Sequence, residues 1–180
     1  AVNVMDEFDL EYAELQFVGD SEVGDHSAQE IREIDNLLRD RGKPVSCLSR
    51  HIFAGMTVAN VPGDELHKKH MDALKRVIDM AHIVDSPLVR IMSPKKEQIL
   101  WGSNGAEKWN VAHGAWDKML PLIAPAIEVI KDAGLTLVVE TGNGTMVNSN
   151  WTGRKLIADI DAKDALKILW DPANHCWCYA

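Results

Sequence analysis

The chain alternates short, almost wholly apolar segments with longer segments that carry an apolar stripe at helical spacing. The short segments are rich in Val, Ile and Leu, which is typical of parallel strands buried on both faces. A complete helical segment precedes each of the last four, as parallel strands require because their connections cross back over the sheet. The sequence therefore predicts one α/β domain over residues 1–180, with five parallel strands at 12–18, 44–53, 88–92, 135–140 and 166–171.

The helical segments carry their own start signals. Ser27 is followed three residues later by Glu30, the spacing of a capping box in which each side chain bonds the other residue's backbone N–H. Asp64 is the predicted N-cap of a long second helix, because its carboxylate can accept from a free N–H of the first turn. Both signals support helices between the predicted strands.

The third and fourth strands are separated by a polar loop predicted at 95–110 and a helical stretch at 111–132. Pro121 and Pro125 fall inside that stretch. Each proline lacks an N–H and clashes with the preceding turn, so we expect the helix to be kinked or divided. A short helix around 153–160 then leads to the fifth strand.

Composition narrows the class of protein. Hydrophobic residues make up 46% of the chain, and no apolar run approaches the ~20 residues of a membrane span. The net charge of −8 argues against non-specific nucleic-acid binding, which needs a basic surface. The amino terminus lacks the pattern of a signal peptide, and three cysteines are too few for a disulfide framework. We therefore expect a cytoplasmic protein with a small-molecule substrate and no nucleic-acid or membrane partner.

Two carboxylates lie where predicted strands end and polar loops begin. Glu140 ends one strand and precedes Thr-Gly-Asn-Gly, and Asp171 ends the next and precedes Pro-Ala-Asn-His. Active sites of α/β folds lie at the carboxyl ends of parallel strands, so both acids are expected at one edge of the sheet. There they are well placed to hold one divalent cation. Spacing alone leaves the alternative of two ordinary loop acids open.

Four further side chains are candidate substrate contacts. Asn174 and His175 follow the second carboxylate and could hydrogen-bond a substrate hydroxyl, or His175 could bond backbone in a loop. His51 lies at the end of the second predicted strand and could line the same mouth, or be a partly exposed loop histidine. Arg90 lies inside the third strand, where it could anchor a carboxylate or phosphate, or form an internal ion pair, perhaps with Glu14.

Four motifs occur in order along the chain: Ala-Glu-Leu at 13–15, Val-Arg-Ile at 89–91, Gly-Leu-Thr-Leu-Val-Val-Glu at 134–140, and Trp-Asp-Pro-Ala-Asn-His at 170–175. This ordered set resembles the sugar phosphate isomerase/epimerase family, the xylose-isomerase-like branch of the (β/α)8 TIM barrels. The five strands look like the second to the sixth of that barrel, and residues 1–10 look like the end of its first helix. The resemblance therefore implies a TIM-barrel fold that is incomplete in this chain, since five strands cannot close a barrel of eight.

The resemblance also implies a chemistry. In the family a divalent ion is held by a Glu on strand five, an Asp on strand six, a His on strand seven and a Glu on strand eight, so only Glu140 and Asp171 carry over. Glu140 would also move a proton beside the carbonyl of a sugar or polyol, through an enediolate, while Asp171 would be a ligand only. Oxygen ligands and a histidine suit Mn²⁺, Mg²⁺ or Co²⁺, with Zn²⁺ possible. A homo-oligomer is also possible.

Other functions fit the same barrel. A lyase of the inosose-dehydratase kind would use the same carboxylates, and a non-catalytic or remnant barrel would explain the missing strands. An apurinic endonuclease is disfavoured, because its zinc cluster needs a histidine where this chain has Asn174 and another where it has Met92-Ser93.

Overall fold

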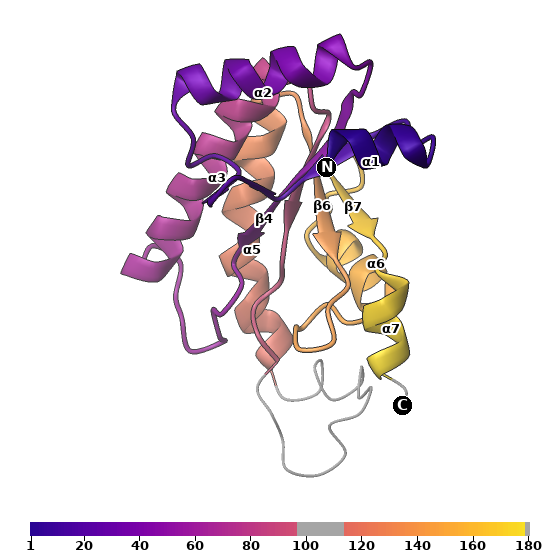
Figure 1. The fold of residues 1–180 in the computed structure, drawn as a ribbon. Helices are drawn as coiled ribbons and strands as arrows, with labels where there is room; N and C mark the ends of the chain where they lie inside the picture. The colour runs from indigo at the N-terminus through magenta and orange to yellow at the C-terminus, as the bar shows by residue number, and fades with distance from the viewer. Residues whose placement is uncertain (97–113, 179–180) are drawn as a thin grey trace.

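A computed structural model of the chain describes residues 1–96 and 114–178, so the loop predicted at 95–110 lies mostly outside the described residues. Within the described ranges no helix is long and apolar enough to cross a membrane. The helices are α1 (Val2–Glu7), α2 (Ala28–Asp40), α3 (Glu65–Ile83), α5 (Ala115–Asp132), α6 (Asn150–Asp159) and α7 (Pro172–Cys178) (Figure 1). The strands are β1 (Ala13–Leu15), β2 (Phe17–Val18), β3 (Ser21–Glu22), β4 (Val45–Ile52), β5 (Leu88–Ile91), β6 (Thr136–Glu140) and β7 (Leu166–Leu169).

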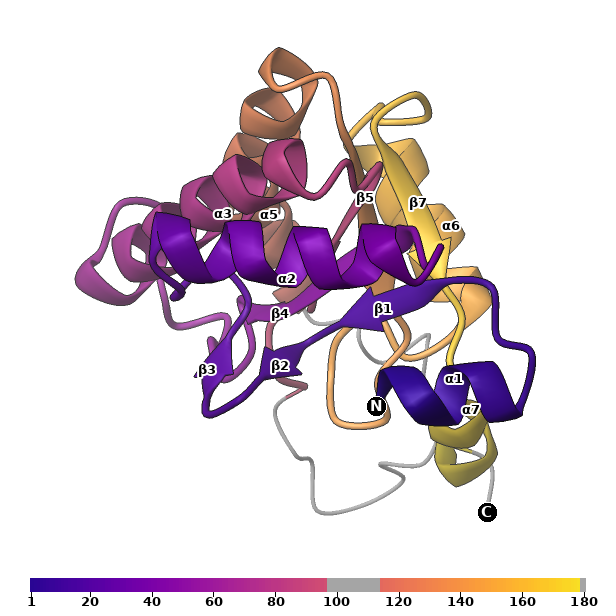
Figure 2. The same cartoon turned by 45° about the horizontal axis from the view of Figure 1, so that its top comes forward.

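The main sheet confirms the predicted architecture. Its strand order is β1-β4-β5-β6-β7, every neighbouring pair is parallel, and the order in space follows the order in the chain. The helices α2, α3, α5 and α6 lie along one side of this sheet (Figures 1 and 2). This is the arrangement of consecutive βα units in a (β/α)8 barrel, of which the described residues form an incomplete part.

The hydrophobic core lies between the sheet and these helices. Leu48, Val89 and Leu137 come from three adjacent strands, have no exposed surface, and belong to one cluster with Leu74 and Val77 of α3. Successive strand residues point to opposite faces of a sheet, so the neighbours of these three residues face the other way. That second face of the sheet carries Cys47, Ser49, Arg90, Val138 and Glu140, so polar and charged side chains lie on it.

The first predicted strand is shorter than expected. The sequence predicts one strand over 12–18, but the structure has β1 at Ala13–Leu15 and then β2 at Phe17–Val18. The latter pairs antiparallel with β3, which lies in what was expected to be a loop. The single residue between β1 and β2 redirects the chain into a hairpin, a change that apolar patterning does not report.

The two internal prolines do not divide α5, so of the two outcomes expected from the sequence, a kink or a division, the division is wrong. Pro121 and Pro125 both lie within one helix, Ala115–Asp132. Seven residues of this helix are buried, so tertiary packing holds it together despite two missing backbone hydrogen bonds. The buried residues are Trp116, Met119, Leu122, Ile123, Ala126, Ile127 and Ile130.

Both predicted helix starts are confirmed. In the capping box of α2, the Glu30 N–H donates to Ser27 Oγ at 3.3 Å and the Ser27 N–H donates to Glu30 Oε2 at 2.7 Å. At the start of α3, the His67 N–H donates to Asp64 Oδ1 at 2.7 Å. Hydrogen bonds from the backbone of His67, the side chain of Asn60 and the backbone of Val61 lower the pKa of Asp64 to about 2.

This lowered pKa predicts an acid-dependent contribution of Asp64 to stability. A carboxyl whose pKa is lower in the folded state stabilises the fold above its unfolded pKa of about 4, and this contribution disappears as the pH falls through about 2. Asp64→Asn keeps an N-cap but removes the charge. We therefore expect the melting temperature of the variant to lie below that of the wild type at pH 7, and the gap to narrow towards pH 2. A gap that does not change with pH would contradict the assignment.

Candidate active site at the ends of strands β6 and β7

The ends of β6 and β7 are joined by the residue that follows Glu140. The Thr141 N–H donates to the Leu169 carbonyl oxygen at 3.0 Å, and the Asp171 N–H donates to Thr141 Oγ1 at 3.0 Å. Thr141 has no exposed surface. Glu140 and Asp171 therefore leave their strands at the same edge of the sheet, where the sequence predicts them.

The side chain of Asn174 bridges the two carboxylates. Its Nδ2 donates to Asp171 Oδ2 at 2.7 Å and lies 3.3 Å from Glu140 Oε1. An amide nitrogen carries two hydrogens, one for each carboxylate. The structure thus brings Glu140, Asp171 and Asn174 together.

Asp171 is also the N-cap of a helix, α7, which lies where the sequence predicts a polar loop. Its Oδ1 accepts the N–H groups of Ala173 at 2.8 Å and Asn174 at 3.2 Å, and α7 begins at Pro172. Asp before Pro is the signature of an N-cap followed by a first helical residue, so the signal was present in the sequence. This cap directs Oδ2 of Asp171 towards Asn174.

Glu140 is buried against Arg90. The guanidinium donates from Nη1 to Glu140 Oε2, and the two side chains are 8% and 11% exposed, respectively. The suggested pairing of Arg90 with Glu14 is wrong, because Glu14 instead accepts a hydrogen bond from Ser49 Oγ. Both carboxylate oxygens of Glu140 are thus held, one by Arg90 and one by Asn174.

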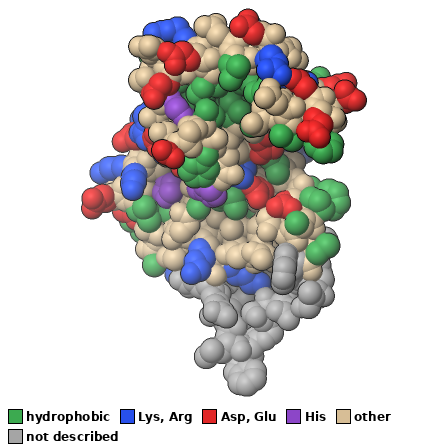
Figure 3. All heavy atoms as spheres, viewed as in Figure 1, with side chains coloured by type: hydrophobic (Ala, Val, Ile, Leu, Met, Phe, Trp, Pro, Cys, Tyr) green, Lys and Arg blue, Asp and Glu red, His purple; other side chains and the backbone are tan. Residues whose placement is uncertain are grey.

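His51 lies in β4 with a different set of partners. Its Nδ1 lies 2.9 Å from Glu22 Oε1, its Nε2 lies 3.1 Å from Gln16 Nε2, and the side chain is 48% exposed. On the face shown in Figure 3, histidine side chains lie close to acidic ones. The contacts of His51 with Glu22 and Gln16 place it beside the β2–β3 hairpin, so the structure does not bring it to the carboxylate pair. His175 lies in α7, and its side chain is outside the described part of the chain.

Cys47 lies on the same face of the sheet as Arg90 and Glu140, and its thiol is buried. It is 3% exposed, and its Sγ lies 3.6 Å from Ser49 Oγ. Burial raises the pKa of the Cys47 thiol to about 11. The thiol is therefore protonated at neutral pH in the absence of a metal ion.

The donor set at Glu140 and Asp171 suits part of a divalent-cation site. Two carboxylates, one of them almost buried, offer the hard oxygen ligands that Mg²⁺ and Mn²⁺ prefer. Among the described residues no group of three or more His, Cys, Asp or Glu side chains could hold a metal ion. Glu140 and Asp171 therefore fit as two ligands of such a site, with the others still to be supplied.

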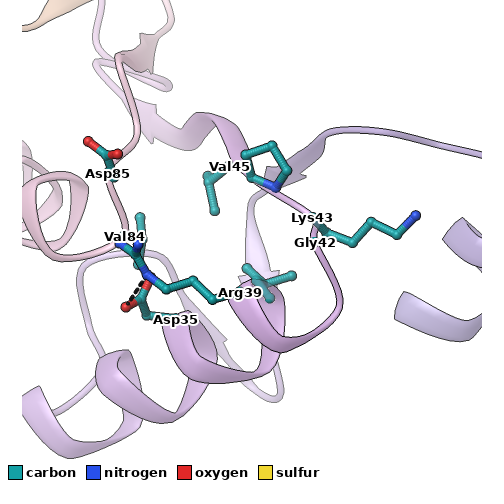
Figure 4. Close-up of a pocket in the computed structure, with 9 residues that line it drawn as sticks. Asp35, Arg39, Gly42, Lys43, Val45, Val84 and Asp85 are labelled. Atoms are coloured by element: carbon teal, nitrogen blue, oxygen red, sulfur yellow. Dashed lines mark hydrogen bonds and ion pairs between the residues drawn. The ribbon is translucent and has the colours of Figure 1, made fainter.

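A separate pocket lies at the opposite end of the strands. It is lined by residues of the second half of α2, of the turn to β4, of the start of β4 and of the segment that follows α3, among them Asp35, Arg39, Val45 and Asp85 (Figure 4). The Arg39 and Asp35 side chains form an ion pair there at 2.7 Å. Val45 begins β4, so this pocket is at the amino ends of the strands, where conserved barrel features serve stability rather than catalysis.

Comparisons with known proteins support the TIM-barrel fold. A family model described as xylose isomerase-like TIM barrel matches residues 2–180. No curated protein matches the chain.

Three solved structures illustrate the likeness of fold. The probable 3-DHS dehydratase involved in petrobactin synthesis from Bacillus anthracis has a TM-score of 0.71 at 15% identity, over 98% of this chain and 58% of that one. The IOLI protein with a binding zinc atom has a TM-score of 0.70 at 10% identity, over 97% and 57%. D-psicose 3-epimerase in the presence of D-fructose has a TM-score of 0.64 at 15% identity, over 94% and 56%. The chain thus spans somewhat more than half the length of these three structures.

Proposed function

Because the chain belongs to the xylose isomerase-like TIM barrel family, we propose that it forms part of a metal-dependent isomerase or epimerase of a small sugar or polyol. The observation that carries the proposal is the pair of carboxylates, Glu140 and Asp171, bridged by one amide at the carboxyl ends of adjacent parallel strands. We place this enzyme in the cytoplasm.

Glu140 is the proposed acid/base residue. A carboxylate beside a substrate carbonyl can remove a proton from the neighbouring carbon and return it, which interconverts isomers through an enediolate. Arg90 and Asn174 fix the two oxygens of Glu140, so its orientation is set before substrate arrives. Asp171 is the proposed second metal ligand, held by its role as the cap of α7.

Glu140 and Asp171 would hold a divalent ion, Mn²⁺, Mg²⁺ or Co²⁺, with Zn²⁺ as a further candidate. When bound, the ion supplies positive charge that stabilises the oxygens of the deprotonated substrate. The zinc atom named for the IOLI structure supports a metal at this fold. The remaining ligands would come from the part of the barrel that the described residues do not contain.

We assign the binding of substrate hydroxyl groups to Asn174 and His175, which follow Asp171. Arg90, which lies beside Glu140, is a further proposed substrate contact. His51 is proposed as a more distant contact at the rim, because its present partners are Glu22 and Gln16. A lyase is the second candidate, because the same base could start an elimination, and the likeness to a probable 3-DHS dehydratase favours it. Deuterium exchange without loss of water separates the isomerase from the lyase.

Metal binding tests the proposal directly. A cation that binds only the folded state at a concentration of about 100 times its Kd raises the free energy of unfolding by about 2.7 kcal/mol. We expect Mn²⁺ to do so in the wild type and not in Asp171→Asn. Asparagine is as good an N-cap as aspartate, so this variant removes the charge but keeps the cap of α7.

Glu128→Gln is the matched control, because Glu128 is an exposed carboxylate on α5. It should keep the full response to Mn²⁺. A wild-type protein whose melting temperature is the same with Mn²⁺ and with EDTA would refute the metal-dependent function and favour a non-catalytic barrel.

A further inference from the structure

Arg90 is buried but only partly used. The residue is 6% exposed, and its Nη1 donates to Glu140 Oε2. Its other two nitrogens, Nε and Nη2, are shielded from solvent and have no hydrogen-bond partner among the described residues. The guanidinium is always protonated in proteins, so the positive charge and these N–H donors are permanent.

Such donors are rare in folded proteins, because a buried N–H group without an acceptor loses its bonds to water and gains nothing in return. The neighbouring strand β4 does not supply the acceptor. Ser49 is paired with Arg90 in the register of the sheet and its hydroxyl donates to Glu14, and neither Ser49 Oγ nor Cys47 Sγ accepts a hydrogen bond from Nε or Nη2 of Arg90. The one carboxylate bound to Arg90, that of Glu140, uses only Nη1.

The two nitrogens Nε and Nη2 lie along one edge of the Arg90 guanidinium. In the planar guanidinium the N–H of Nε and one N–H of Nη2 run side by side, and their spacing matches the two oxygens of a carboxylate. A lysine offers no equivalent, since its ammonium is a point charge without a fixed fork.

We propose that the Nε/Nη2 edge of Arg90 binds a carboxylate of the substrate, so that the substrate class is sugar acids rather than neutral sugars. This inference rests on the proposed function, because it places the anion beside the acid/base residue. Glu140 and the bound carboxylate share one guanidinium, so the carbon that loses its proton lies close to the carboxylate. The site thus selects polyols that carry a carboxylate next to the reacting carbonyl.

Three ligands with one carbon skeleton test this inference. D-fructose, 2-keto-D-gluconate and D-fructose 1-phosphate carry at carbon 1 a hydroxymethyl group, a carboxylate and a phosphoryl ester, respectively. Binding is measured by calorimetry on the full chain, with Mn²⁺ and again with EDTA. We expect 2-keto-D-gluconate to bind at least about tenfold more tightly than D-fructose, the effect of one charge-assisted hydrogen bond or more.

The variant Arg90→Lys keeps a cation beside Glu140 but removes the fork, so the preference for 2-keto-D-gluconate should fall about tenfold. Arg154→Lys, on the exposed side of α6, is the matched control and should keep it. A merely structural role for Arg90 would weaken all ligands equally and leave the ratio of affinities unchanged, which would overturn the inference.

The comparison of the three ligands needs only the wild type, so it decides the matter even where Arg90→Lys does not fold. Equal affinities, no binding of any ligand, or a preference for D-fructose 1-phosphate over 2-keto-D-gluconate would each overturn the assignment of a carboxylate. If the metal-dependent function is wrong, the protein will not bind Mn²⁺. The ratio of the affinities for 2-keto-D-gluconate and D-fructose, measured with EDTA, does not depend on that result.

Discussion

Replacing Glu140 by glutamine is expected to reduce metal-dependent turnover by at least about a hundredfold. Positioned proton transfer typically contributes about 10²–10⁴ to the rate, and glutamine cannot take up a proton. Its amide oxygen can still accept from Arg90 Nη1, so the contact that orients residue 140 is kept in part. The variant also leaves the buried Arg90 cation without its carboxylate, so its stability has to be measured beside its turnover.

The measurement is proton exchange at the carbon beside the carbonyl, followed by NMR in deuterated water with a panel of ketoses and keto acids. Circular dichroism and the melting temperature show whether Glu140→Gln is folded. Glu128→Gln removes a carboxylate from the exposed side of α5 and should exchange at the wild-type rate. Full activity of Glu140→Gln would refute Glu140 as the acid/base residue and, with it, the proposed mechanism.

The sheet was predictable from sequence because two features of the sequence indicate each parallel strand of an α/β fold. Each strand is a run of apolar residues, as in Leu137–Val139, and each is flanked by a helix with its own cap, as at Ser27 and Asp64. Once consecutive strands are taken to be parallel neighbours, the order β1-β4-β5-β6-β7 follows from the chain.

The errors lie where local rules and tertiary packing compete. Proline rules predict a kink or a division of α5, but the helix is not divided at Pro121 and Pro125, because its buried side chains hold it together. The β2–β3 hairpin is set by backbone conformation over Phe17–Glu22 and leaves no apolar pattern. The start of α7 was missed because Asp171 was considered only as a ligand, although Asp-Pro is also a helix start.

The positions of the two acids at the sheet edge were predictable from sequence, but their contacts were not. The position of Glu140 and Asp171 at strand ends follows from the pattern of the chain. The partner of Arg90 does not follow from this pattern, because Glu14 and Glu140 both lie on the face of the sheet that carries Arg90. The bridge made by Asn174 depends on the first turn of α7, so it could not be derived before that helix was known.

Replacing Arg90 by methionine is expected to cost about 3–5 kcal/mol in the free energy of unfolding. The side chains of Arg90 and Glu140 are 8% and 11% exposed, so the variant would leave a buried carboxylate without its cation. The cost is measured by urea unfolding, with the slope of the transition compared between variants to confirm that the same surface is exposed. A surface ion pair such as Arg39–Asp35 is the control, since removing it should cost about 1 kcal/mol or less.

The double variant Arg90→Met with Glu140→Gln separates the value of the ion pair from the cost of an unpaired charge. Replacing both partners of a buried pair by neutral groups is often close to neutral, whereas removing one is strongly destabilising. We therefore expect the double variant to recover most of the stability that Arg90→Met loses. If the two losses instead add, Glu140 is not stabilised by Arg90, and the orientation of the acid/base residue must come from Asn174 alone.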